Sequence, residues 1–124
     1  APASDPPPPP PPAVCPAVAA HTWVAARLYE TCTSACTEAG LTCSTEPTLP
    51  TTEQCFLDTT EAMAPRSDGT FFRCNLSWQI LPLSGDFLPA KRASSDRCYY
   101  PAPDSPAFSC GVRDAGYYRL CPCD

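Results

Sequence analysis

The sequence has little positive charge, and what it has is scattered. Lys91 is the only lysine, and the net charge is −5. The seven arginines form no basic stripe along the chain: Arg27, Arg66, Arg73, Arg92, Arg97, Arg113 and Arg119. Proteins that bind nucleic acid cluster Lys and Arg side chains against the phosphates. We therefore expect no nucleic-acid partner.

Long apolar runs and catalytic motifs are also missing. No apolar run approaches the ~20 residues that cross a bilayer, so we expect no membrane span. There is no Gly-rich phosphate loop and no C-x-x-C redox pair. His21, the only histidine, is the only candidate base for a serine triad, and a lone histidine near an apolar stretch is more often structural. With thirteen acidic residues, a pair of carboxylates for glycoside hydrolysis would be available by chance. We expect no enzymatic activity and no cofactor.

Cysteine and proline are abundant, with 10 and 18 residues, whereas Leu, Ile, Val and Phe are sparse. The cysteines are Cys15, Cys32, Cys36, Cys43, Cys55, Cys74, Cys98, Cys110, Cys121 and Cys123. A cysteine content of about 8 % is at the edge of the range that indicates a disulfide scaffold, in which covalent links replace missing apolar burial. Zinc is the alternative, but it favours paired C-x2–4-C knuckles, often with histidine. We expect five disulfides and no metal.

The pairing of the cysteines cannot be read from their spacing, because ten cysteines allow about 945 pairings. Cys121 and Cys123 lie two residues apart, so on a strand they point to the same face. In that position they can bond to two different segments of the chain.

Disulfides persist in oxidising compartments, which indicates an extracellular protein. The tripeptide "NLS" makes Asn75 an N-glycosylation acceptor, and residues 44–52 are rich enough in Thr and Pro to carry O-linked sugar. The first residue is Ala rather than Met, and no signal peptide is present. We expect that processing has removed one or that the sequence begins downstream of it.

Two helices and a first strand are predicted in residues 15–64. Residues 21–28 favour a short strand with Trp23 inward. Cys32 and Cys36 share one face of a helical turn, with Thr31 as N-cap and Gly40 at the end, where Leu41 folds back.

The second helix is predicted to begin at Thr51, which has the capping-box spacing to Gln54, and to end before Pro65. Its inward face would carry Phe56, Thr60 and Met63.

Short strands and loops are predicted for residues 65–124. Residues 66–70 read as a turn, residues 71–78 as a strand, residues 81–96 as an irregular connection and residues 116–124 as a terminal strand. Prolines interrupt a strand in residues 97–110 and predict an exposed edge. The expected fold is a small disulfide-rich α+β domain over residues 15–124, with two short helices and a few short antiparallel strands.

Residues 1–14 are predicted to be an N-terminal arm. Its proline run consists of Pro6, Pro7, Pro8, Pro9, Pro10, Pro11 and Pro12. Contiguous prolines adopt polyproline II, which rises ~3.1 Å per residue and has no internal hydrogen bonds, so seven make a rod of roughly 20 Å. Such a rod must be held from outside, by its own domain, a neighbouring subunit or attached sugar. The simpler interpretation is a stiff linker.

Two cysteine-containing stretches resemble a known module. "TCTSACTEAGLTC" at residues 31–43 and "FSCGVRDAGYYRLCPC" at residues 108–123 resemble the cysteine-rich module at the C-terminus of the branching β1,6-N-acetylglucosaminyltransferase, and they also resemble domains in secreted proteins of green algae and other protists. The resemblance covers residues 23–123. The transferase module carries no known catalytic residue, so the resemblance implies none in this chain. Cys15 and the arm lie outside its pattern, which implies a different use of the module.

The proline run resembles the proline-rich stretches of algal and plant cell-wall glycoproteins, in which contiguous prolines are hydroxylated and carry short arabinose chains. This resemblance implies hydroxylation and O-glycosylation of residues 6–12.

The aromatic residues beside proline or glycine are expected to be exposed and are candidates for contact with sugar or with an arm, namely Tyr99, Tyr100 and Tyr117. The alternative is that they belong to the core. We expect an extracellular structural glycoprotein, a subunit of a glycan-coated filament or a cell-surface or wall assembly, whose arm is gripped by a neighbouring copy. The alternative is a carbohydrate-binding or accessory module of a larger secreted protein.

Overall fold

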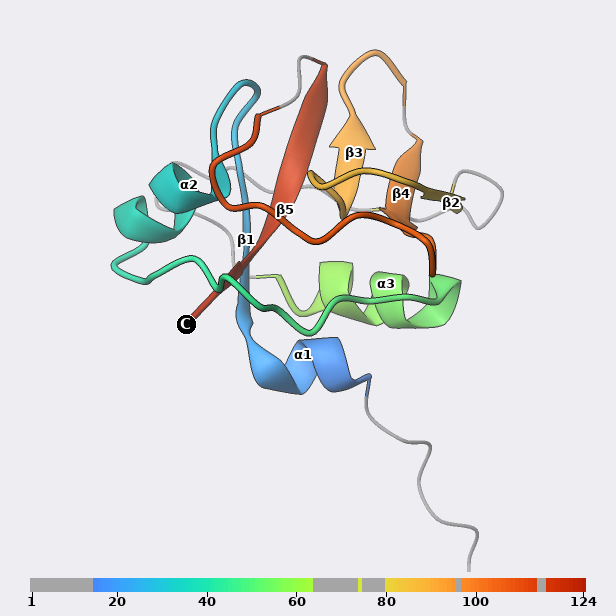
Figure 1. Ribbon diagram of the computed structural model, residues 1–124, viewed down its shortest axis with the longest axis horizontal. Coiled ribbons are helices and arrows are strands. Elements are labelled where there is room, and N and C mark those ends of the chain that lie inside the picture. Colours follow the sequence, from blue (N-terminus) through green and yellow to red (C-terminus); the bar gives the residue numbers. More distant parts are fainter. Residues whose placement is uncertain (1–14, 64–73, 75–79, 96, 114–115) are drawn as a thin grey trace, which may run out of the picture.

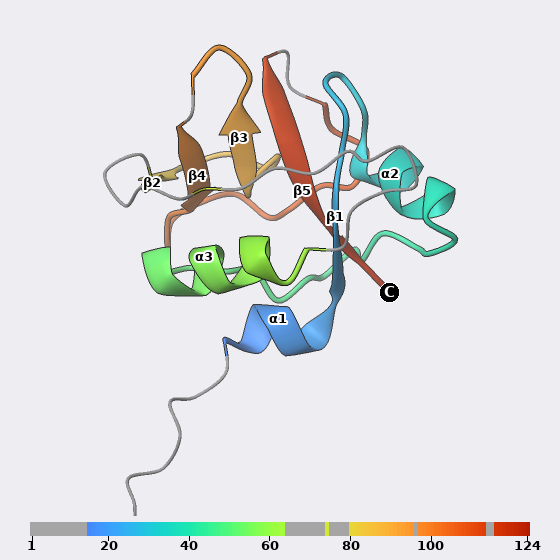
Figure 2. The same cartoon turned by 180° about the vertical axis from the view of Figure 1, so that it is seen from behind.

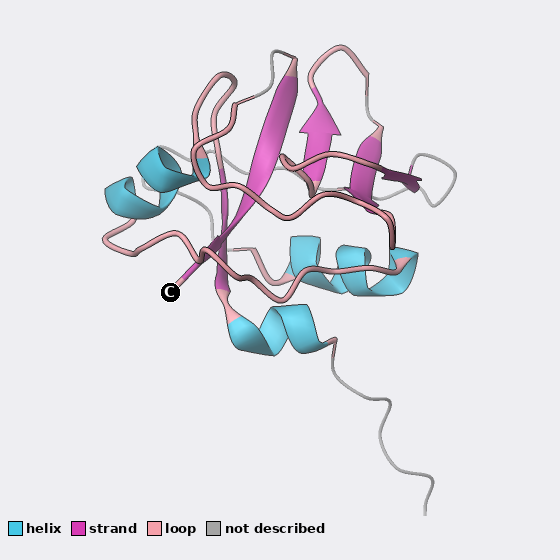
Figure 3. Cartoon of the chain, in the orientation of Figure 1, coloured by secondary structure: helices cyan, strands magenta, loops and turns pink. Residues whose placement is uncertain are grey.

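A mixed five-stranded sheet with helices beside it forms the centre of the computed structural model (Figure 1). The structure describes residues 15–63, 74, 80–95, 97–113 and 116–124. The elements are α1 (Pro16–Ala20), β1 (Thr22–Ala25), α2 (Cys32–Glu38), α3 (Glu53–Glu61), β2 (Ile80–Leu83), β3 (Ala90–Arg92), β4 (Cys98–Pro101) and β5 (Tyr117–Cys123). Seen from both sides, α1 and α3 lie together at one end of the strands, and α2 lies beside β1 and β5 (Figures 1 and 2). Long loops connect the elements (Figure 3).

The strand order is β1-β5-β3-β4-β2. β5 pairs antiparallel with β1 and β3, β3 pairs antiparallel with β4, and β2 pairs parallel with β4. The predicted disulfide-rich α+β class is therefore confirmed. In detail, the described residues form three helices rather than two, and one strand pair is parallel.

The first predicted helix is confirmed as α2. The Thr31 hydroxyl accepts a hydrogen bond from the Ser34 N–H at 3.1 Å, which caps the helix. Gly40 has φ +77°, the left-handed conformation that ends helices, and the Leu41 N–H donates back to the Cys36 carbonyl at 2.8 Å. α2 carries two of the cysteines that join it to β5, so its position along the chain decides where these disulfides form.

Removing the α2 cap should lower stability by a modest and measurable amount. We expect Thr31→Ala to cost about 1 kcal/mol of unfolding free energy, because the Ser34 N–H loses its acceptor. Thr33→Ala, at an exposed position inside the same helix, is the matched control and should change stability by less than about 0.5 kcal/mol. Denaturant unfolding without reductant measures both, and equal losses would contradict the assignment of the cap.

The second predicted helix, α3, begins one residue later than expected. Its cap is Thr52, whose hydroxyl accepts from the Cys55 N–H at 3.1 Å. Phe56 and Thr60 are buried and Met63 packs against the core, as predicted.

The short helix α1 was not expected. Its N-cap residue makes no side-chain cap, and Ala17, which is fully buried, is its point of contact with the core.

Two strand predictions were wrong. Residues 81–96 are not an irregular connection, because they include most of β2 and all of β3. The strand in residues 97–110 is not an exposed edge, because β4 lies between β3 and β2.

The terminal strand is confirmed as β5, and Trp23 on β1 is buried as predicted. The predictions for residues 1–14, 65, 66–70 and Asn75, and the strand predicted over 71–78, fall outside the described residues apart from Cys74.

All ten cysteines are paired, as predicted. The disulfides are Cys15–Cys55, Cys32–Cys121, Cys36–Cys123, Cys43–Cys110 and Cys74–Cys98. Of the pairings left open, Cys121 and Cys123 bond to one and the same segment, because both partners lie one turn apart on α2. Residues two apart on a strand point to the same side, and so do residues four apart on a helix. The sulfurs of Cys121 and Cys123 therefore face those of Cys32 and Cys36.

Half-cystines make up much of the core. Cys32, Cys36, Cys98 and Cys121 are fully buried, beside large apolar side chains such as Trp23.

None of the described helices is long and apolar enough to cross a bilayer.

Candidate functional site

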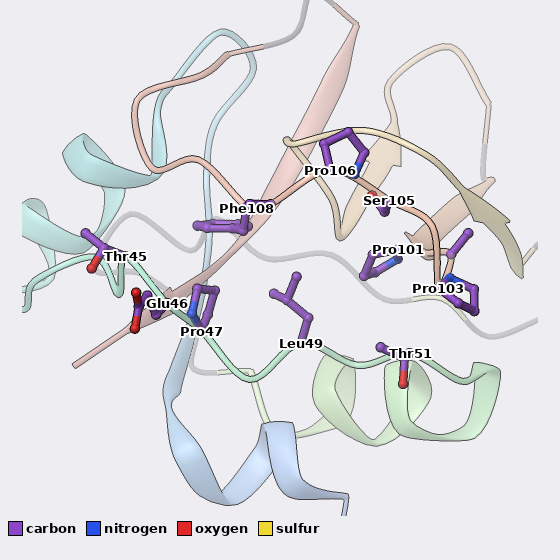
Figure 4. Close-up of a pocket in the computed structure, with 12 residues that line it drawn as sticks. Thr45, Glu46, Pro47, Leu49, Thr51, Pro101, Pro103, Ser105, Pro106 and Phe108 are labelled. Atoms are coloured by element: carbon purple, nitrogen blue, oxygen red, sulfur yellow. The ribbon is translucent and has the colours of Figure 1, made fainter.

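Two proline-rich loops, residues 45–51 and 101–108, face each other across a cleft of about 360 Å³ (Figure 4). The lining side chains are mostly apolar: Pro47, Leu49, Pro101, Ala102, Pro103, Pro106, Ala107 and Phe108, with Thr45, Glu46, Thr51 and Ser105 as the polar members. Thr45 and Thr51 lie toward opposite ends of the cleft, and Leu49 points into its middle (Figure 4). We call this feature the proline-lined cleft.

The first wall of the cleft, residues 45–51, is held at both ends and in the middle. The Ser44 N–H donates to the Pro122 carbonyl at 3.0 Å just before the wall begins. The Thr48 N–H donates to Nε2 of His21 at 2.9 Å. Thr52, directly after the wall, caps α3. An extended segment with few backbone partners is thus fixed by contacts with three separate parts of the fold.

His21 positions this wall through both of its ring nitrogens. Because Nε2 accepts from Thr48, the ring donates through Nδ1 to the carboxylate of Asp124 at 2.7 Å. The ring also makes an edge contact with Trp23, with centroids 5.8 Å apart. In this arrangement neither nitrogen has a free lone pair with which to take a proton from a nucleophile.

The hydrogen bond from His21 lowers the pKa of Asp124 below the usual carboxyl value of 3.8. Because folding lowers the pKa of the Asp124 carboxyl, the ionised carboxylate stabilises the folded protein at pH values above the ordinary pKa. This stabilisation is lost as the pH falls through the lowered pKa. We expect His21→Ala to raise the pKa of the Asp124 side chain. The pH dependence of the NMR shift of its side-chain carboxyl carbon measures this pKa. Thr22→Ala, an exposed neighbour, is the control and should leave that titration unchanged. An unchanged titration in His21→Ala would contradict the pairing.

The second wall, residues 101–108, is attached to residues 83–86. The Ala102 N–H donates to the Leu83 carbonyl at 3.0 Å. The Ser105 hydroxyl accepts from the Gly85 N–H and donates to the Gly85 carbonyl, both at 3.0 Å. Two bonds at one hydroxyl occupy the one polar side chain that this wall offers to the cleft.

Phe108, at one end of the second wall, rests on a buried arginine. The guanidinium carbon of Arg119 lies 4.8 Å from the centroid of the Phe108 ring. Arg119 is only 1 % exposed and donates to three backbone carbonyls, those of Asp86, Phe87 and Val112. Burial lowers its pKa to about 10, with the charge of Asp86 opposing the shift, so the side chain is still charged at neutral pH.

The two walls are covalently joined near one end. The disulfide Cys43–Cys110 lies two residues before Thr45 and two residues after Phe108. Because the same bridge anchors both loops, their separation at this end is fixed. The proline-lined cleft is therefore a preformed feature of the fold.

The three predicted tyrosines do not line this cleft. Tyr99 is buried, so its predicted exposure was wrong; it packs edge-on against Tyr117, with centroids 6.0 Å apart. Tyr117 is half-buried and also packs against Phe87 with tilted rings, whose centroids lie 4.9 Å apart. Tyr100 is half-buried against Phe56. The core interpretation of these rings therefore describes their surroundings better than a sugar platform does.

Sequence reasoning missed Phe108 as a site residue. The signal for it was present, because three prolines at 101, 103 and 106 lead directly to this aromatic ring. The predicted O-glycosylated stretch, residues 44–52, turns out to contain the first wall. The other predicted sugar positions, Asn75 and the proline run, lie outside the described residues.

A second hollow, of about 450 Å³, lies beside Arg27 and Arg113. Arg27 is engaged by the carboxylate of Glu38, at 2.8 and 2.9 Å. Arg113 donates to the carbonyl of Tyr29 at 3.5 Å. Within the part of the chain that the structure describes, no group of three or more His, Cys, Asp or Glu side chains is placed to hold a metal ion.

Comparison with protein-family models and with curated proteins found no match to this chain.

Proposed function

We propose that this chain is an extracellular structural glycoprotein. The observation that carries the proposal is the pairing of all ten cysteines into five disulfides, which link residues from Cys15 to Cys123. Disulfides of this density are typical of small secreted domains, whereas the cytosol and the nucleus keep thiols reduced. A domain locked in this way suits a long-lived structural role.

The arm supports a role as a subunit of a filament or of a cell-surface or wall assembly. The seven contiguous prolines are predicted from the sequence to form a stiff rod, and such a rod would lose little conformational entropy when it binds. If the arm of one copy binds the domain of the next, the contact is heterologous, and such contacts grow into filaments when their rotation does not close. Sugars on Asn75 and on the proline run would coat the assembly.

Imaging and mass spectrometry of protein purified from a secreting host test this proposal. We expect filaments or higher oligomers under non-reducing conditions, a glycan on peptides spanning Asn75, and added oxygen or pentose on the proline run. Asn75→Gln is the control for the first modification and should remove one glycan mass only. Discrete monomers at high concentration, together with unmodified peptides, would contradict the proposal.

A carbohydrate-binding or accessory module is the second candidate function. It is favoured by the proline-lined cleft, which is open to solvent and carries an aromatic ring at one end. A glycan array separates the two candidates, because a binding module should retain one preferred class of sugar, whereas a structural subunit should retain none.

A further inference from the structure

We propose that the proline-lined cleft is the receptor for the proline run of a neighbouring copy of this chain. This inference rests on the proposed function and names the surface that would grip the arm. Its grounds are the chemistry of the lining, the length of the first wall, and the charge at one end of the cleft.

The lining suits a proline rod better than it suits a sugar. Four of the lining residues are prolines, and Leu49 and Phe108 add apolar surface. Grooves that bind polyproline II are lined by aromatic rings, of which this cleft has Phe108, and the rod offers such a surface pyrrolidine rings and no N–H donors. A sugar needs several polar partners, and because the Ser105 hydroxyl is already bonded twice to Gly85, the polar side chains left in the lining are those of Thr45, Glu46 and Thr51.

The length of the rod lies within the span that the first wall can reach. The first wall has seven residues, and an extended chain of that length spans at most about 24 Å. Seven prolines in polyproline II span roughly 20 Å. The hydroxyl-bearing residues Thr45 and Thr51 lie toward the two ends of the cleft, where they can donate to carbonyls of a bound rod.

The charges set the direction of the rod. Among the described residues, Glu46 is the one charged residue that lines the cleft, and it lies at the Thr45 end. In the arm, Asp5 directly precedes the proline run. Like charges repel, so the run is expected to bind with its Asp5 end toward Thr51 and its Pro12 end toward Glu46.

This direction favours a neighbouring copy over the chain's own arm. The arm joins the domain at Cys15, which is bonded to Cys55 in the first turn of α3, close in sequence to Thr51. An arm bound in its own cleft would therefore start at the Thr51 end and bring Asp5 toward Glu46.

The test compares sedimentation equilibrium of the full chain with that of three variants. Ala107→Glu places a charge on the exposed cleft lining, and Ala93→Glu places the same charge at an exposed position after β3, away from the cleft. The third variant replaces Pro7, Pro9 and Pro11 by serine and so breaks the rod. We expect the wild type and Ala93→Glu to associate equally, and Ala107→Glu and the arm variant to associate about tenfold or more weakly, since a charge buried against prolines lacks a partner.

A heptaproline peptide added to the wild-type chain supplies a direct readout, since it should shift the amide NMR signals of residues 45–51 and 107–108 and dissociate the oligomer. If the arm variant is monomeric but Ala107→Glu associates like the wild type, the cleft inference is overturned while the proposed assembly stands. If the wild type is monomeric and the peptide shifts nothing, both are overturned. A monomer in which the peptide competes with the arm, or shifts caused by free sugars alone, would also overturn the neighbouring-copy proposal.

Discussion

Removing both disulfides between α2 and β5 is expected to cost more than the sum of the costs of removing each one. The two bridges, Cys32–Cys121 and Cys36–Cys123, join the same pair of elements. While one is present, the other closes a loop of only about six residues, four along α2 and two along β5. The chain-entropy relation gives about 2 kcal/mol for such a loop.

When both bridges are absent, restoring the first closes a longer loop. Cys43–Cys110 remains, and the path through it covers seven residues from Cys36 to Cys43 and thirteen from Cys110 to Cys123. A loop of about 20 residues corresponds to about 3.3 kcal/mol by the same relation. The double removal should therefore cost about 5.5 kcal/mol, against about 2 kcal/mol for either bridge alone, which exceeds the sum by about 1 kcal/mol.

Denaturant unfolding of three variants measures this difference: Cys32→Ala with Cys121→Ala, Cys36→Ala with Cys123→Ala, and all four together. The buried cysteines leave small cavities in every variant, so the coupling is taken from the complete double-mutant cycle. Costs that add within error would mean that each bridge closes its own long loop in the unfolded chain, and the two bridges would then not be coupled.

Arg119→Met is expected to lower the unfolding free energy by about 3 kcal/mol or more. Methionine keeps most of the buried volume, but the carbonyls of Phe87 and Val112 lose their donor, whereas the carbonyl of Asp86 keeps the Ser109 N–H at 2.9 Å. Each buried acceptor left without a partner costs on the order of 1 kcal/mol or more. The loss should be concentrated at the second wall of the cleft, because Phe108 rests on this side chain.

Arg119→Lys separates the charge from the shape of the guanidinium. The ammonium keeps the charge but cannot reach three carbonyls and stack on a ring at once, so we expect a loss of about 2 kcal/mol. The control is Arg92→Met on the exposed end of β3, which should stay within about 0.5 kcal/mol. Denaturant unfolding gives the free energies, and hydrogen exchange of the Ser109 N–H reports on the wall. Equal losses at positions 92 and 119 would contradict this role.

Local sequence signals correctly predicted the elements whose ends are determined by residues close to them in the sequence. Thr31 and Gly40 define α2 with side-chain and backbone geometry that the residue types alone indicate. The strand β5 was predicted although it contains Pro122. The Pro122 carbonyl accepts from the Ser44 N–H, and the nitrogen of Pro122 faces the same side of the strand as this carbonyl. On that side β5 is paired only through an isolated bridge, so the missing N–H of Pro122 costs little.

Prolines misled the prediction where their position in the sheet decides the outcome. Pro82 is tolerated because β2 is an edge strand, and Pro101 because it is the last residue of β4. Nothing local distinguishes these cases, since the strand order arises from pairing across the chain. The proline-lined cleft was missed for the same reason: its walls are about fifty residues apart and are brought together by Cys43–Cys110.

The place of β5 in the sheet has a consequence for biosynthesis. β5 lies between β1 and β3, and both cysteines of α2 await partners on it, although it follows every other strand along the chain. Nascent chains emerging from a ribosome would thus expose unpaired strand edges and free thiols until this stretch arrives. Maturation should therefore depend on oxidoreductases and chaperones that keep Cys32 and Cys36 from reacting with earlier, wrong partners.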